Sequence, residues 1–218
     1  MSICLAITDV DWALTKDVFA IIGTLVSAAG VGLAFYVGLK GLATWSRQLK
    51  GTSDHELSRK ALIELYRYRE AVERARSPVM FGYESDLTPE EANGLNFSEQ
   101  RHLGRRKGYH GRFDRISKTR EPIHITLLDA EAIWGKELGE LFKPLFVLQS
   151  EFHTYVEYDL MATDPQQDED SRRSYYGVIK DRRKVMYDKT DDIGDEFRQE
   201  FNAASLAIEN YLRPKLIK

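Results

Sequence analysis

The most prominent pattern along the chain is an apolar run close to its beginning. Residues 18–39 read VFAIIGTLVSAAGVGLAFYVGL, which is 22 residues without a charged side chain. As a helix this run would span roughly 33 Å, and the hydrocarbon core of a bilayer is about 30 Å thick. A helix in the core of a soluble protein shows a polar face, and this run has none. The pattern therefore predicts a transmembrane helix over 18–39, preceded by a short N-terminal segment over 1–17.

Basic residues on either side of the run predict its orientation. Lys16 is the only lysine or arginine before it, whereas Lys40, Arg47 and Lys50 follow it with no acid before Asp54. Because cytoplasmic flanks carry the excess of basic residues, we expect the N-terminal segment outside and the C-terminal domain in the cytoplasm. The segment before the run is net negative, unlike the basic start of a cleaved signal peptide. The run is therefore predicted to stay in the lipid bilayer as a single-pass anchor.

Small residues recur at every fourth position of this run, at Gly30, Ala34 and Gly38. Helices in lipid associate through close backbone approach, which small side chains permit. The spacing predicts transmembrane packing between copies of the chain and therefore a homo-oligomer. The alternative is that these residues only face lipid, because small residues are common in transmembrane helices.

Beyond the run, apolar residues recur at spacings of three and four, which is typical of amphipathic helices. A short amphipathic connector is expected over 40–52, ending in a helix break at residues 51–54. Ser53 and Glu56 form the S-x-x-E pattern of a capping box, which predicts the start of a new helix. The apolar stripe of this helix is Leu57, Ala61, Leu65, Tyr68, Val72 and Ala75.

The rest of the chain is also predicted to be helical, with no strand of useful length. In the loop over 79–97, Thr88 should cap a single turn that starts at Pro89. Further helices are expected over 98–119, from Pro122 to about residue 156 with a kink at Pro144, over 172–188 and over 191–212. The expected fold is all-α: one N-terminal transmembrane helix, then an antiparallel bundle of four or five helices in a domain over 53–218.

Composition and missing motifs narrow the range of functions. The 218 residues carry a net charge of −3, so the chain is not a polycation that coats nucleic acid. Its single cysteine, Cys4, excludes an internal disulfide and a multi-cysteine metal site. The sequence contains neither the phosphate-binding pattern G-x-x-x-x-G-K-[ST] nor the hydrolase patterns G-x-S-x-G and H-E-x-x-H. We therefore expect no catalytic residues, no cofactor and no enzymatic activity.

Two E-x-x-H patterns are the only sign of a metal site. They are formed by Glu99 with His102 and by Glu121 with His124. Di-iron bundles use two such pairs and further glutamates, because side chains at i and i+3 share one helix face. The first pair lies in a basic stretch interrupted by glycines, and the second lies beside a proline, so a chance occurrence is favoured. A metal-dependent helical-bundle enzyme is kept as a second alternative.

Residues 101–120, RHLGRRKGYHGRFDRISKTR, contain eight basic residues and one acid, Asp114. Guanidinium groups bind phosphate through paired hydrogen bonds, and aromatic rings stack on flat ligands. The candidates for contact with a ligand, a phosphate or a lipid headgroup are Arg101, Arg105, Arg106, Lys107, Tyr109, Arg112 and Arg115.

Three interpretations of this basic segment stay open. Its charges could pair with acids elsewhere, such as those at 164–170 or 191–196. They could contact anionic lipid headgroups, since the domain is tethered to a membrane. They could also contact a nucleotide or nucleic acid, which is not the favoured interpretation.

Four stretches are WSRQLKG at 45–51, LSRKALIELYRYREAVERARSPV at 57–79, EAIWGKEL at 131–138 and NAASLAIENYLRPKL at 202–216. In these stretches the chain resembles many uncharacterised bacterial proteins that a single span anchors in the inner membrane. The resemblance implies an architecture and a place in the bacterial inner (plasma) membrane, and it supplies no catalytic residues.

Together these patterns predict a membrane-anchored cytoplasmic helical module for interaction or sensing, with a protein partner in the cytoplasm. The alternative is an oligomeric membrane effector that senses a phosphate-bearing ligand through residues 101–120.

Overall fold

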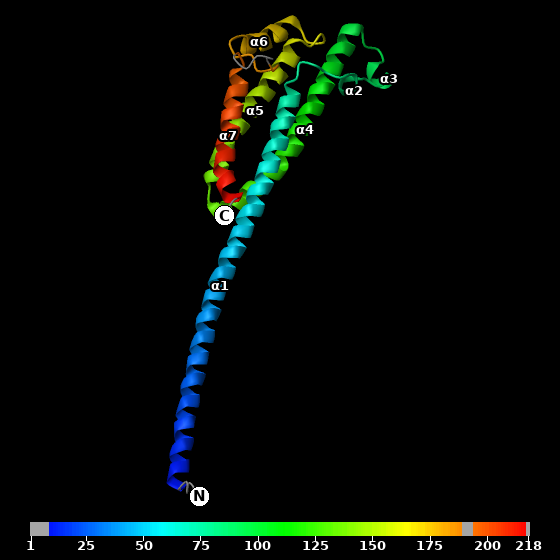
Figure 1. The fold of residues 1–218 in the computed structure, drawn as a ribbon. Helices are drawn as coiled ribbons and strands as arrows, with labels where there is room; N and C mark the ends of the chain where they lie inside the picture. Colours follow the sequence, from blue (N-terminus) through cyan, green and yellow to red (C-terminus); the bar gives the residue numbers. More distant parts are fainter. Residues whose placement is uncertain (1–8, 189–193, 217–218) are drawn as a thin grey trace. The chain divides into compact units, whose positions relative to one another are not determined.

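Helices are the only regular elements in the described part of the chain (Figure 1). The computed structural model describes residues 9–188 and 194–216. In chain order the helices are α1 (Asp9–Ala75), α2 (Gly82–Ser85), α3 (Pro89–Ala92), α4 (Phe97–Trp134), α5 (Glu137–Ala162), α6 (Glu169–Lys180) and α7 (Glu196–Leu216). The all-α class predicted from the periodicity is confirmed. The chain divides into two compact units, Met1–Ser53 and Asp54–Lys218, and α1 contributes to both.

In the first unit, the apolar run is one uninterrupted stretch of α1. Every residue over 15–42 is exposed, so no other part of the described chain covers the apolar side chains. Of the helices described, α1 alone is long and apolar enough to cross a membrane. A Cβ atom built on Gly30 or Gly38 would meet nothing within 4 Å, so the face that carries the small residues is open.

The helix break predicted at residues 51–54 is wrong, because α1 continues through these residues to Ala75. A single glycine such as Gly51 costs a helix only about 1 kcal/mol. The next residue, Thr52, does not interrupt the helix either, because its hydroxyl donates to the carbonyl of Gln48 at 3.0 Å. Tertiary contacts then hold the following turns: the indole of Trp134 donates to Asp54 at 2.8 Å, and Leu57 is buried.

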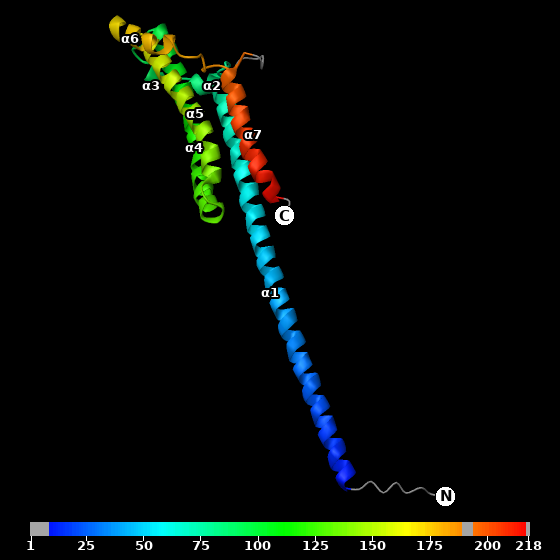
Figure 2. The same ribbon diagram turned by 90° about the vertical axis from the view of Figure 1, so that its left-hand side faces the viewer.

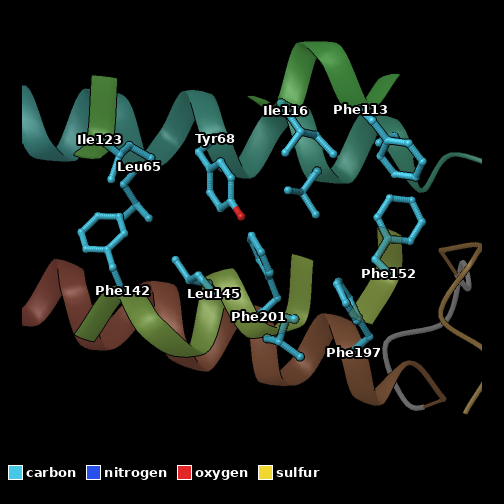
Figure 3. Close-up of a cluster of buried hydrophobic side chains, with 14 of the residues drawn as sticks. Leu65, Tyr68, Phe113, Ile116, Ile123, Phe142, Leu145, Phe152, Phe197 and Phe201 are labelled. Atoms are coloured by element: carbon cyan, nitrogen blue, oxygen red, sulfur yellow. The ribbon is translucent and has the colours of Figure 1, made fainter. Parts of the chain in front are cut away.

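The second unit is a helical bundle around one apolar core. Helices α4 and α5 pack against each other as a hairpin (Figure 2). The 54–75 part of α1 lies against α7, where the rings of Tyr68 and Phe201 stack at 6.1 Å. Figure 3 shows side chains from all four helices meeting in the core: Leu65, Tyr68, Phe113, Ile116, Ile123, Phe142, Leu145, Phe152, Phe197 and Phe201. The apolar stripe predicted for 57–75 is confirmed, since each of its six residues is buried.

The long helix predicted to start at Pro122 and to continue to about residue 156 is wrong. The chain reverses at Gly135, whose φ of 81° lies in the region that glycine adopts without strain, and α5 starts at Glu137. Pro122 lies inside α4 instead of opening a helix. Packing explains its place, because Ile116 and Ile123 on either side of it are both buried in the core.

Other predicted boundaries have mixed outcomes. The turn at Pro89 is confirmed, with the amide of Glu91 donating to the Thr88 hydroxyl at 3.2 Å. The helix predicted over 172–188 is α6, which begins earlier, at Glu169, and ends at Lys180. The last helix begins at Glu196 instead of 191 and continues past Pro214 to Leu216, and residues 191–193 of its predicted range lie outside the described residues.

Candidate functional site

The basic segment 101–120 belongs entirely to α4, and its seven candidate contact residues fall into separate environments. Arg101, Arg106 and Arg115 are exposed. Within the described part of the chain, the side chains of Arg101 and Arg106 form no ion pair or hydrogen bond. The other four are held by contacts inside the domain: Arg105, Lys107, Tyr109 and Arg112.

Arg112 is the most completely engaged of these residues, with only 3% of its side chain exposed. Its guanidinium donates to both carboxylate oxygens of Glu84, at 3.2 and 2.9 Å. It also donates to the carbonyls of Ala75, Ser77 and Val79 at 3.1, 2.8 and 2.7 Å, which ties down the end of α1. Hydrogen bonding to Arg112 lowers the pKa of Glu84 below its ordinary value. Arg112 therefore has a structural role: it holds Glu84 and the chain that follows α1 against α4.

Arg105 and Lys107 pair with acids on other elements. Arg105 donates to Asp159 of α5 at 2.6 Å, and Lys107 donates to Glu91 of α3 at 2.7 Å. Burial acts to lower the pKa of Arg105, but the attraction of Asp159 and its other neighbours outweighs burial and raises the pKa. The predicted pairing with acids elsewhere therefore occurs, but the partners are not those expected. Only His102, 4.0 Å from Asp164, meets an acid of the loop at 164–170.

A cavity of about 530 Å³ opens beside the N-terminal half of this basic segment. Its charged lining is entirely basic and comes from α4, with Arg101, Arg105 and Arg112, and the imidazole of His102 lies on the same helix. No carboxylate of the described residues is among the side chains that line it. We refer to this space as the Arg101 cavity.

Two glycines of α4 allow the opposite wall of the Arg101 cavity to approach. A Cβ on Gly104 would lie 2.6 Å from the carbonyl oxygen of Ser85, and one on Gly108 would lie 2.5 Å from the sulfur of Met80. Both glycines are buried under the segment that precedes and includes α2. From the sequence they were noted only as glycines that interrupt the basic stretch. Their spacing of four, on one helix face, was the signal for a close contact.

Arg76, which sequence reasoning missed, positions the far edge of the cavity. It is buried and donates to the carbonyls of Val185 and Tyr187, at 2.9 and 3.1 Å, and to both carboxylate oxygens of Asp195. These bonds hold Tyr187 at the cavity, which Tyr109 also lines. Burial, and then the neighbouring Tyr187, raises the pKa of Tyr109, so the Tyr109 phenol stays neutral near pH 7.

His102 is the histidine that lines the cavity. Burial lowers its pKa below the ordinary value for histidine, Asp164 and Asp159 act to raise it, and the positive charges of Arg105 and Arg106 lower it further. The imidazole is therefore neutral at pH 7.

The residues of the two E-x-x-H patterns do not form a metal centre in the described structure. Glu99 accepts a hydrogen bond from the amide of Asn96 as part of a helix cap, and His102 faces the Arg101 cavity. Glu121 is exposed, and His124 is bonded to Arg120 at 3.1 Å. Among the described residues, no group of three or more histidine, cysteine, aspartate or glutamate side chains could hold a metal ion. Cys4 lies outside the described residues.

Comparisons with protein-family models, with curated proteins and with solved structures find no match for this chain.

Proposed function

We propose that the protein is a membrane-anchored helical module for interaction or sensing, and that it is not an enzyme. The apolar part of α1 is its single transmembrane helix in a bacterial inner membrane. The second unit, an antiparallel bundle of four or five helices, lies in the cytoplasm and binds a protein partner. The observation that carries this proposal is the complete exposure of residues 15–42, because a surface of this apolar character is stable in lipid and not in water.

Several copies would act together in this proposal. A single span cannot form a pore by itself, so an effect on the membrane requires an oligomer. The open face at Gly30, Ala34 and Gly38 would let two spans approach closely.

Membrane association and orientation are tested together in a bacterial host. The full chain should stay in the membrane pellet after alkaline extraction, and a C-terminal reporter that is active only in the cytoplasm should be active. Replacing both Leu25 and Val31 by arginine should release the chain, since each arginine near the centre of a span costs about 2.5–3.5 kcal/mol. Leu206→Arg is the matched control, because Leu206 is 54% exposed on α7 and should keep the chain in the pellet.

Two results would overturn this proposal. If alkaline extraction releases the unmodified chain from the membrane pellet, α1 is not a transmembrane anchor. Reporter activity found only on the outer side would reverse the orientation.

A second candidate function is favoured by the Arg101 cavity. In it, the protein is a membrane effector that senses a phosphate-bearing ligand through the basic segment 101–120. A concave site with a wholly basic charged lining is the arrangement that selects anions. Salt-dependent binding of phosphate compounds to the full chain tests it. No group of described residues favours the metal-dependent enzyme considered from the sequence.

A further inference from the structure

The Arg101 cavity has one wall of hydrogen-bond donors. Arg101 presents a guanidinium that no described residue engages, which leaves its full set of donors for a ligand. Beside it lie the imidazole of His102 and the hydroxyl of Ser98. Arginine matches the oxygens of a phosphate group better than lysine does, because its planar fork donates two parallel hydrogen bonds.

Another part of the cavity lining is apolar and aromatic. Pro78 and Met80 contribute aliphatic surface, and Tyr187 contributes a ring that is 43% exposed. A thioether and a phenol ring facing a cavity offer a flat ligand group contacts on its faces and edges. A free phosphate ion would reach only the donor wall and would leave this second wall without a contact.

We propose that the Arg101 cavity binds one small molecule that joins a phosphate group to a flat heteroaromatic ring, the chemistry of a nucleoside monophosphate. The phosphate lies against Arg101 and His102, and the ring lies against Met80 and Tyr187. The volume of about 530 Å³ falls within the range of sites that enclose a ligand of this size. The inference rests on the second candidate function and specifies its ligand.

Arg101 is the anchor among the seven candidate residues, because the other arginines of the cavity are already engaged. Arg112 uses its donors on Glu84 and three carbonyls, and Arg105 is paired with Asp159. Arg115 is exposed on the same helix and does not line the cavity. This division separates binding in the cavity from a general attraction to the basic segment.

Protonation of His102 should tighten binding, because it places a positive charge beside the phosphate. His102 faces Asp164 and Asp159 on one side and Arg105 and Arg106 on the other, and burial lowers its pKa. A bound phosphate would favour the protonated imidazole and raise that pKa. By linkage, protonating His102 then increases affinity for the phosphate by the same factor.

The experiment uses the full chain in nanodiscs of phosphatidylcholine, which carry no net charge. Four probes are titrated by calorimetry: adenosine 5′-monophosphate, adenosine, inorganic phosphate and glycerol 3-phosphate. We expect adenosine 5′-monophosphate to bind at least about tenfold more tightly than each of the other three, because only it reaches both walls. Binding by adenosine alone at the same affinity, or no binding of the monophosphate, would overturn the proposal.

Matched variants locate the binding. Arg101→Gln should weaken monophosphate binding by about tenfold or more, since it removes charge-assisted hydrogen bonds, whereas Arg115→Gln should leave it unchanged. Tyr187→Leu should weaken monophosphate binding and leave inorganic phosphate unaffected. Equal losses in Arg101→Gln and Arg115→Gln would show diffuse attraction to α4 and would overturn the proposal.

Glycerol 3-phosphate separates a soluble ligand from a lipid headgroup, because it carries the phosphate without a ring. If it binds as tightly as the monophosphate, the ring wall contributes nothing and the ligand assignment fails, while phosphate sensing survives. If no probe carrying phosphate binds, the second candidate function fails too. The membrane pellet and reporter assays are independent of both outcomes.

Discussion

The two parts of helix α1 differ in one respect that decides their surroundings. Over 18–39 the helix is apolar on all sides, and Phe35, for example, is 69% exposed. Over 57–75 apolar and charged residues alternate with helical period, and Leu65 is completely buried. A helix that is apolar all round has no face that water would stabilise, whereas an amphipathic helix has one face for the core and one for water. The distribution of apolar residues round the axis therefore separates a helix with no side suited to water from a core helix.

The hydrogen-bond partners of polar side chains also differ between the two parts of the chain. In and just after the apolar run, the hydroxyls of Thr24 and Thr44 donate to backbone carbonyls one turn earlier, at 2.9 Å each. In the second unit, buried arginines bond to residues far along the chain: Arg76 to Asp195 and Arg112 to Glu84. A hydroxyl that donates to a carbonyl one turn earlier in its own helix needs no other element. A buried arginine in a packed domain needs acceptors that other elements supply.

The largest effect should come from the same substitution placed in each region. Phe152 is fully buried among aromatic rings, so Phe152→Ala should lower the free energy of unfolding of the second unit by about 3–5 kcal/mol. Phe35→Ala should leave it within about 0.5 kcal/mol, because Phe35 touches none of the core. Denaturant unfolding monitored by near-ultraviolet circular dichroism measures both. Similar losses in the two variants would break the comparison.

The next effect should come from Arg112. Arg112→Lys keeps the charge opposite Glu84 but cannot reach the carbonyls of Ala75, Ser77 and Val79 together. Leaving buried acceptors without donors should cost about 2–3 kcal/mol of unfolding free energy. Arg115→Lys, on the exposed side of α4, is the control and should have no measurable effect. An equal loss of unfolding free energy in Arg115→Lys would assign the effect to helix α4 in general and not to the hydrogen bonds of Arg112.

Substitutions at two glycines of α4 should change the stability of the second unit by smaller amounts. Gly104→Ala would place a Cβ 2.6 Å from a backbone carbonyl oxygen. Overpacking of about 1–3 kcal/mol, partly offset by roughly 1 kcal/mol of helix propensity, should give a net loss of up to about 2 kcal/mol. Gly111→Ala meets nothing within 4 Å on the same helix, so it should stabilise by up to about 1 kcal/mol. Thermal melts of the two variants should shift in opposite directions.

The stability of the second unit should also depend on pH, through an effect smaller than those of the substitutions above. The pKa of His102 in the folded state lies below its unfolded value, mainly because of burial. The unfolded chain therefore binds more protons between these two values, and stability falls as the pH drops from about 6.5 through the folded pKa. His102→Gln should flatten this part of the stability profile. An unchanged slope would assign the dependence to other groups.

The smallest effect on a single chain is expected at Gly30, where the surroundings are open. Gly30→Leu should not change unfolding of the second unit or membrane insertion. It should weaken crosslinking between copies, because a bulky side chain prevents close approach of two spans. Unchanged crosslinking would place the contact between copies elsewhere.

Sequence reasoning recognised the elements whose signals are local and strong. The apolar run of 22 residues, the stripe from Leu57 to Ala75 and the Thr88 cap need no knowledge of the rest of the chain. Its errors lie where two local signals compete. A break at Gly51 and a start at Pro122 were both plausible from propensity, and both were wrong, because packing outweighs penalties of this size.

The candidate site shows the same limit more clearly. From the sequence we could predict a basic segment over 101–120. We could not distinguish Arg101, Arg105 and Arg112 as candidates for contact with a ligand. Tertiary structure alone decided that Arg112 is buried against Glu84, that Arg105 pairs with Asp159, and that Arg101 faces a cavity without a partner. The physical reason is that an arginine's role depends on which acceptors come within about 3 Å of its donors. Those acceptors lie on α1, α2 and α5, and only folding brings them to α4.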